Sequence, residues 1–141
     1  MIPEKLRLSR SRYSESSTPD NWVGTPKLKV MFDFEKLDVY VKVKDYNKSV
    51  TTFLLSKKLD RVTNDQLSRA SFSIMLNIAE GSGRFTKPDK KHFYVIARGS
   101  VFECVAIFDY LKDIDSIDNK THLQYYVVLE EISKMLYALI K

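Results

Sequence analysis

The sequence has few of the residues that sheet proteins need at their turns: only four glycines and four prolines among 141 residues. A β-sandwich or barrel requires turn signals at short, regular intervals, and this chain does not supply them. The composition therefore favours a helical fold. Cys104 is the only cysteine, which excludes an intrachain disulfide and indicates a reducing compartment, expected to be the cytoplasm.

Long apolar runs are also missing. No stretch approaches the ~20 uninterrupted apolar residues that a membrane span requires, and no apolar segment of the secretory type precedes a small-residue cleavage site. We therefore expect neither a membrane anchor nor a secretory signal. Hydrophobic residues make up 44% of the chain, enough for the core of one domain. The formal net charge of +5 mildly favours polyanionic partners.

Residues 1–31 differ in composition from the rest of the chain. They hold three of the four prolines and a series of serines interleaved with Arg7, Arg10 and Arg12, and they show no helical or strand period. A segment of this kind is typical of disorder, because it offers too little apolar surface to bury. We predict a disordered basic arm over residues 1–31 and one folded domain over residues 32–141.

Four helices are predicted from apolar residues that recur at intervals of three and four. The predicted core stripes are Val39, Val43, Tyr46, Val50 and Phe53; Leu67, Ala70, Ser71, Ile74 and Ile78; Phe93, Ile96, Ser100, Cys104, Ile107, Leu111 and Ile114; and Tyr125, Leu129, Ile132, Leu136 and Leu139. Short connections between such helices give an antiparallel up-down-up-down four-helix bundle. The predicted fold class is therefore all-α.

Local signals set the expected helix ends. The first helix is expected to run to about residue 59, and Thr63 with Gln66 forms a capping box for the second. The second helix should end at the Gly-Ser-Gly segment 81–83, where a glycine takes the left-handed conformation without steric cost. Thr86 caps the third helix, and Pro88 falls in its first turn, where a missing N–H does no harm.

Four segments carry a resemblance to a known family. They are residues 34–40 (Phe-Glu-Lys-Leu-Asp-Val-Tyr), 77–84 (Asn-Ile-Ala-Glu-Gly-Ser-Gly-Arg), 96–100 (Ile-Ala-Arg-Gly-Ser) with Glu103, and 129–140 at the end of the fourth helix. Through them, residues 32–141 resemble the bacterial four-helix-bundle proteins encoded in intervening sequences of 23S ribosomal RNA genes. The resemblance implies a homo-oligomer, expected to be a homopentamer. It also implies a nucleic-acid connection, because a related accessory protein works with a reverse transcriptase in diversity-generating retroelements.

No catalytic or metal-binding constellation is visible in the sequence. His92 and His122 are far apart and have no cysteine or carboxylate at ligand spacing, and Cys104 falls in a core stripe. No nucleophile–base pair and no set of acid, base and oxyanion stabiliser can be assembled. We expect a protein that is not an enzyme and has no cofactor, metal or small-molecule substrate.

Polar residues on or near the apolar faces of the second and third helices allow two interpretations. Asn77, Glu80, Arg98 and Glu103 could line a ligand site between the helices or form a structural network. We favour a network in which Arg98 lies between the two glutamates, because buried charges must be paired.

Small residues in the third helix predict close packing. Gly99 lies in the middle of this helix, at a cost of ~1 kcal/mol relative to alanine. With Ala97 and Ser100 it forms a small-residue patch. We expect this patch to face a neighbouring subunit, or the second helix at Ala70, Ser71 and Ser73.

The strongest functional signal is the basic segment 84–98, which has five cations, one acidic residue and interleaved aromatic residues. Up-down topology would bring it to the same end of the bundle as the arm, with the acidic connection at 109–118 at the opposite end. We predict that this positive end binds RNA or DNA non-specifically through backbone phosphates. The predicted contact residues are Arg69, Arg84, Lys87, Lys90, Lys91 and Arg98.

Two other interpretations of the basic segment stay open. It could be a solvated loop with scattered lysines, although cations near a helix N-terminus are mildly unfavourable and so indicate some other role. Alternatively, the bundle could be an adaptor for a protein partner, such as a reverse transcriptase or a ribosome-associated protein, without contacting nucleic acid itself. Retention of a protein partner after nuclease treatment would favour the adaptor.

Overall fold

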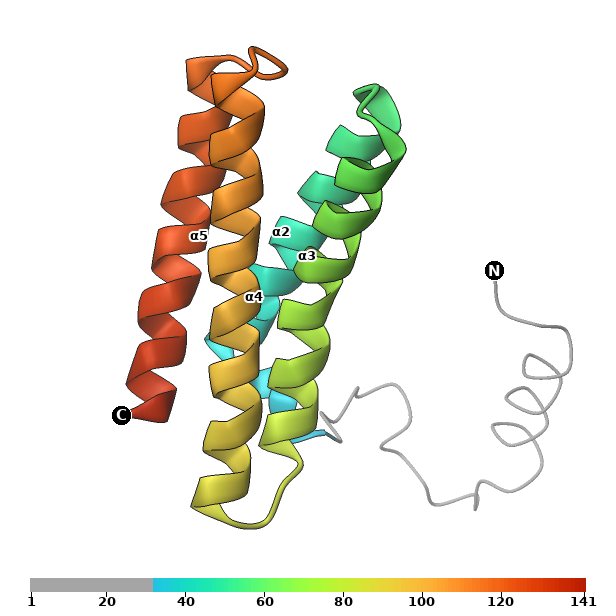
Figure 1. The fold of residues 1–141 in the computed structure, drawn as a ribbon. Coiled ribbons are helices and arrows are strands. Elements are labelled where there is room, and N and C mark those ends of the chain that lie inside the picture. Colours follow the sequence, from blue (N-terminus) through green and yellow to red (C-terminus); the bar gives the residue numbers. More distant parts are fainter. Residues whose placement is uncertain (1–31) are drawn as a thin grey trace, which may run out of the picture. The chain divides into compact units, whose positions relative to one another are not determined.

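The computed structural model describes residues 32–141, and the regular structure in this part of the chain is exclusively helical. A short 3-10 helix, η1 (Asp33–Lys36), precedes four α-helices: α2 (Asp38–Ser56), α3 (Arg61–Ser82), α4 (Lys87–Asp113) and α5 (Asn119–Ile140). Figure 1 shows these four helices as one bundle. The all-α prediction is confirmed. The arm predicted over residues 1–31 lies outside the described residues.

Contacts between helices fix their relative directions. In each of three helix pairs, the residue numbers of two contacts rise along one helix and fall along the other. The contacts are Lys42–Glu131 and Ser49–Tyr125 between α2 and α5, Ser73–Ser100 and Ser82–Lys90 between α3 and α4, and Arg98–Ser133 and Asp109–His122 between α4 and α5. The pairs α2–α5, α3–α4 and α4–α5 are therefore antiparallel, and α2 must then be antiparallel to α3. The α3–α4 connection lies at one end of this up-down-up-down bundle and the other two connections lie at the opposite end (Figure 1).

The stripes predicted for α2, α3 and α5 form most of the core. Their buried residues are Val39, Val43, Tyr46, Val50, Leu67, Ala70, Ser71, Ile74, Ile78, Tyr125, Leu129, Ile132 and Leu136. Only the last position of two stripes departs from the prediction, because Phe53 is half-buried and Leu139 is 36% exposed. Burying one apolar stripe from each helix supplies the main driving force for this fold.

An aromatic cluster ties α2, α4 and α5 together inside the bundle. The rings of Phe108 and Tyr125 are stacked with their centroids 4.3 Å apart. Phe53 lies against both rings, at 6.0 and 5.7 Å, and Tyr46 meets Tyr125 edge to face at 6.1 Å. Offset and edge-to-face pairs of this kind add specific geometry to the burial of apolar area.

α4 buries a different face from the one predicted. Its buried residues are Tyr94, Ala97, Val101, Cys104, Phe108 and Leu111, so the two stripes coincide only at Cys104 and Leu111. The predicted core residues Ile96 and Ile114 are 39% and 52% exposed. The prediction failed because α4 has apolar residues on several sides, and intervals of three and four fit two adjacent stripes equally well.

Two helix ends also differ from the prediction. α2 ends at Ser56, before the expected residue 59, and α3 begins at Arg61 because its N-cap is Asp60 rather than Thr63. The Asp60 carboxylate accepts a hydrogen bond from the Thr63 N–H at 3.2 Å. A carboxylate satisfies this N–H and also carries a negative charge at the positive end of the helix dipole.

The Gly-Ser-Gly segment serves helix packing rather than the predicted left-handed cap. α3 continues through Ser82, and its C-cap Gly83 has a φ of −85°. No glycine among the described residues has a positive φ. Gly81 is buried, and a Cβ at this position would lie 2.9 Å from the Phe93 Cβ and 2.9 Å from the Tyr94 ring. Its missing side chain therefore lets α4 approach α3 closely.

Replacing Gly81 with alanine should lower the free energy of unfolding by about 1–3 kcal/mol, because the added methyl group must push the start of α4 away from α3. Gly83→Ala is the matched control, since its Cβ would lie 3.6 Å from the nearest atom and its φ suits alanine. Urea unfolding followed by circular dichroism measures both variants. Equal stabilities of the two variants would contradict this role of Gly81.

The bundle should lose stability as the pH falls below about 3.8. Asp60 and Asp118 cap α3 and α5, and hydrogen bonds from Thr63 and Thr121 hold the pKa of each carboxyl below its ordinary value of 3.8. Stabilisation by the ionised caps is therefore complete above this value and is lost as the pH falls through the lowered pKa values. The double variant D60N/D118N still has capping side chains that do not titrate. Melting temperatures measured against pH should fall less steeply for this variant than for the wild type.

Candidate nucleic-acid interface

The connection between α3 and α4, residues 83–86, is the centre of the predicted interface. Thr86 caps α4 as predicted, with its hydroxyl accepting a hydrogen bond from the Asp89 N–H at 3.2 Å, and Pro88 lies in the first turn. Lys87 and Lys91 are exposed and lie four residues apart, which places them on the same face of α4. We call Arg84, Lys87, Lys90 and Lys91 the basic cluster.

Two members of the basic cluster are engaged with the protein itself. The Arg84 guanidinium donates a hydrogen bond to the Glu80 carboxylate at 2.8 Å and lies over the Phe93 ring, 4.5 Å from its centroid. The Lys90 ammonium donates to the Ser82 carbonyl at 2.8 Å. Among the described residues, Lys87 and Lys91 have no ion-pair partner, whereas Lys90 keeps its charge but is tied to the Ser82 carbonyl.

The structure does not bring Arg69 and Arg98 into the basic cluster. Arg69 is exposed on α3 and lies about 20 Å from Arg84 along the helix axis, at 1.5 Å per residue. Arg98 packs its guanidinium against the rings of Phe102 and Tyr137, 4.8 and 5.5 Å from their centroids. These two arginines would therefore meet different parts of a bound strand or none of it.

The polar network expected around Arg98 does not form. Glu80 pairs with Arg84, Glu103 is exposed, and among residues 32–141 no ion pair joins Arg98 to either glutamate. Instead, Arg98 donates from Nε to the Ser133 carbonyl of α5 at 3.4 Å. The reason is the face that α4 buries: Ala97 occupies the buried position, and Arg98 is turned toward α5.

The fourth residue of that network, Asn77, belongs to a small polar group between α3 and α4. Its amide donates to the Ser73 carbonyl and hydroxyl at 2.9 and 3.0 Å. Ser100 donates to the Ser73 hydroxyl at 2.9 Å. Ser100 thus faces α3 as predicted and Ala97 is buried, whereas Gly99 is exposed and a Cβ there would meet nothing within 4 Å.

A chain of polar side chains buried in the core was not predicted from the sequence. The Tyr46 hydroxyl lies 3.0 Å from the Ser71 hydroxyl, which lies 3.5 Å from the Cys104 sulfur. Burial raises the pKa of both Tyr46 and Cys104, so both are neutral at physiological pH. Ser71, a polar residue within an apolar stripe, was the one signal in the sequence.

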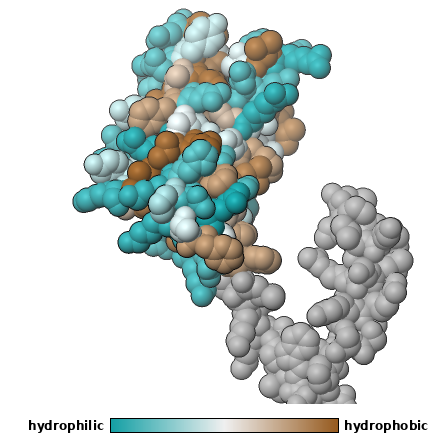
Figure 2. Space-filling model, turned by 60° about the horizontal axis from the view of Figure 1, so that its bottom comes forward, coloured by the Kyte–Doolittle hydropathy of each residue, from teal (hydrophilic) through white to brown (hydrophobic). Residues whose placement is uncertain are grey.

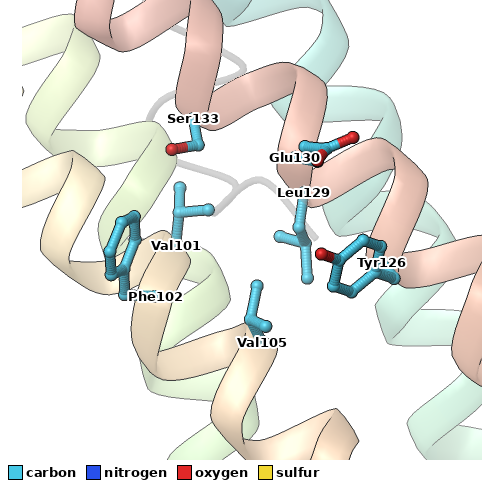
Figure 3. A pocket seen from close by; sticks show the side chains of 7 residues that line it. All are labelled: Val101, Phe102, Val105, Tyr126, Leu129, Glu130 and Ser133. Carbon is cyan, nitrogen blue, oxygen red and sulfur yellow. The ribbon is translucent and has the colours of Figure 1, made fainter.

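An exposed apolar surface follows the outer side of α4 and α5. A hollow of about 230 Å³ is lined by Val101, Phe102 and Val105 from α4 and by Tyr126, Leu129, Glu130 and Ser133 from α5 (Figure 3). A second hollow of about 340 Å³ adjoins it at Phe102 and is lined by Val95, Arg98, Gly99, Phe102, Tyr137 and Ile140. We call the two together the α4–α5 groove.

The positive end is less uniform than predicted. η1 packs against α3 and the start of α2, which brings Asp33 and Glu35 to the end that carries the basic cluster. Figure 2, in which this end is turned forward, shows hydrophilic and hydrophobic side chains intermixed. At the opposite end, Lys57 lines one hollow with Asp115 and Asp118. Each end of the bundle therefore carries charges of both signs.

Neither a cluster of potential metal ligands nor a membrane-spanning helix is found among residues 32–141. No three His, Cys, Asp or Glu side chains gather there as potential metal ligands. His92 lies edge to face with Phe93, and the His122 Nε2 is 4.0 Å from the Asp109 carboxylate. None of the helices between residues 32 and 141 combines the length and apolarity that crossing a membrane takes.

Comparisons with known proteins agree with this fold. Residues 35–138 match the family model described as 23S rRNA-intervening sequence protein. A crystal structure from Bacteroides thetaiotaomicron, described as a protein with unknown function from the S23 ribosomal protein family, is similar with a TM-score of 0.69 and 23% sequence identity. The similarity covers 73% of this chain and 98% of that chain, and it shows a shared fold. No curated protein matches the sequence.

Proposed function

This chain belongs to the 23S rRNA-intervening sequence protein family, and we propose that it is a non-enzymatic bundle that binds RNA or DNA at the basic cluster. The observation that carries the proposal is the pair Lys87 and Lys91. Both are exposed on one face of α4 and have no ion-pair partner among the described residues. Arg84 and Lys90, which are held by Glu80 and Ser82, fix the connection beside them.

The chemistry of the basic cluster suits phosphates better than base edges. A lysine ammonium is a compact charge on a flexible stem, so it binds a phosphate without reading the base attached to it. Binding of this kind is non-specific and depends strongly on salt, because each neutralised phosphate releases counterions. Two available lysines per chain bind phosphates only weakly. Assembly of several chains would strengthen the binding, because one strand could contact several pairs of lysines.

We further propose that the chain is a homo-oligomer, and the family resemblance makes a homopentamer the expected form. The α4–α5 groove supports this, because Phe102, Tyr126 and Tyr137 are 56%, 43% and 55% exposed. Contiguous exposed apolar surface of this kind marks interaction sites. Gly99 lies in the groove without a side chain, which allows another helix to approach. A closed ring would gather several basic clusters and multiply weak phosphate contacts.

The α4–α5 groove also favours a second candidate function. A protein-interaction adaptor could use the same apolar surface to hold a reverse transcriptase or a ribosome-associated protein without touching nucleic acid. Pull-down from nuclease-treated lysate separates the two candidates, because an adaptor keeps its protein partner when nucleic acid is removed. A cytoplasmic location, expected from the single cysteine, belongs to both candidates.

Neutralising the two available lysines should weaken nucleic-acid binding for every sequence alike. For the variant K87Q/K91Q we expect the slope of log affinity against log salt to shrink by about 0.7–0.9 per lysine that contacts a phosphate. Titration of labelled RNA at several salt concentrations measures this slope. K57Q/K58Q removes two exposed lysines from the opposite end and should leave the slope unchanged. Binding that is absent or insensitive to salt would contradict the proposal.

Placing a charge in the α4–α5 groove should separate the subunits. Phe102→Glu adds a carboxylate where we propose a dry contact between chains, and desolvating it there is unfavourable. Phe72→Glu is the matched control, because Phe72 is 51% exposed on α3, outside the groove. Native mass spectrometry should find F102E as a monomer and F72E as the wild-type assembly. Identical masses for all three proteins would remove the groove from the interface.

A further inference from the structure

Phe85 differs from every other large apolar side chain in the described part of the chain, because it is 100% exposed. It lies in the α3–α4 connection, between Arg84 and the N-cap Thr86. A side chain that is fully in water contributes no burial energy to folding. The stability of the bundle therefore does not account for a phenylalanine at this position.

The connection that carries Phe85 is held on both sides. On the α3 side, the Arg84 N–H donates to the Gly81 carbonyl at 3.1 Å, and its guanidinium is bound to Glu80. On the α4 side, Thr86 caps the helix and Lys90 reaches back to the Ser82 carbonyl. The ring is thus presented from a fixed turn, which reduces the entropy lost when a ligand orders it.

The surroundings of Phe85 define the chemistry of its ligand. Lys87 follows two residues later, and Lys91 lies one turn further along the same face of α4. A ligand that satisfies this group has a flat apolar face close to negative charge. An unpaired nucleotide has both features, whereas a duplex hides its base faces in the stack.

We infer that Phe85 is a stacking platform for an unpaired base, with Lys87 and Lys91 holding the adjacent phosphates. The protein therefore prefers single-stranded RNA or DNA to a duplex. This inference rests on the proposed function, because it places the stacked base within a strand bound at the basic cluster.

An anionic membrane also combines negative charge with an apolar interior, so it is an alternative ligand. The acidic residues near the connection favour a single strand over such a membrane. A membrane is flat, so it would meet Asp89 of α4 and Asp33 and Glu35 of η1 together with the lysines. Those carboxylates would oppose binding to a negative surface. A single strand is narrow and can follow Lys87 and Lys91 alone.

The test compares three labelled probes at one low salt concentration: oligo(dT), the same strand annealed to oligo(dA), and a strand of equal length with abasic sites. Phe85→Ala should weaken binding to oligo(dT) by about 5- to 150-fold, the effect of losing one base–aromatic stack. Its affinities for the duplex and the abasic strand should stay at the wild-type values. Phe85→Trp should retain binding, and Phe85→Leu, which is apolar but not aromatic, should lose it.

Tyr110→Ala is the matched control, since Tyr110 is 55% exposed among acidic residues at the other end of α4. It should leave all three affinities unchanged. If the wild type binds intact and abasic strands equally and F85A changes nothing, the stacking role is wrong while the proposed function stands. If the wild type binds no probe, both are wrong. Phosphatidylserine vesicles serve as a fourth probe: if F85A weakens binding only to them, the partner is a membrane and the inference is overturned.

Discussion

Close packing between α3 and α4 is the constraint on which the rest of the molecule depends. Gly81 lacks the side chain that would meet Phe93 and Tyr94. The Ser73–Ser100 hydrogen bond at 2.9 Å fixes the register of the two helices. Once this register is set, the connection between the helices is short and tightly bonded. The lysines and Phe85 are therefore presented from a rigid part of the bundle.

The same contact decides which residues of α4 remain in solvent. Turning Ala97 and Val101 inward leaves Val95, Gly99 and Phe102 on the outer side, beside Tyr137 of α5. A helix that has apolar residues on more than one side must either expose some of them or pair with a further surface. α4 thus links the two proposals: its first turns bear the basic cluster and its middle lines the α4–α5 groove.

Much of the fold could be predicted from the sequence: the stripes predicted for α2, α3 and α5 are buried in the bundle except at Phe53 and Leu139. α4 could not be oriented in this way, since its apolar residues fit two adjacent stripes, and the error carried over to Arg98. Whether Arg98 faces α3 or α5 depends on how α4 is rotated about its own axis, which the spacing of its apolar residues does not determine. The cations between residues 84 and 91 could be identified from the sequence. Which of them are available to a ligand could not, because Arg84 and Lys90 bind Glu80 and the Ser82 carbonyl only in the folded chain. In the sequence Phe85 could not be told from Phe93, which is half-buried, or Tyr94, which is buried; only the structure shows that Phe85 is fully exposed.

The Tyr46–Ser71–Cys104 chain places a thiol where it can react only when the bundle core opens. The only thiol of the chain is fully buried, hydrogen-bonded to Ser71 and kept protonated by a raised pKa. An alkylating reagent needs a solvent-accessible thiolate, and neither condition is met while the helices are closed. The rate at which Cys104 is alkylated therefore measures how often the bundle core opens, and fraying of the helix ends does not contribute to it. Core opening can thus be compared between variants without an introduced label.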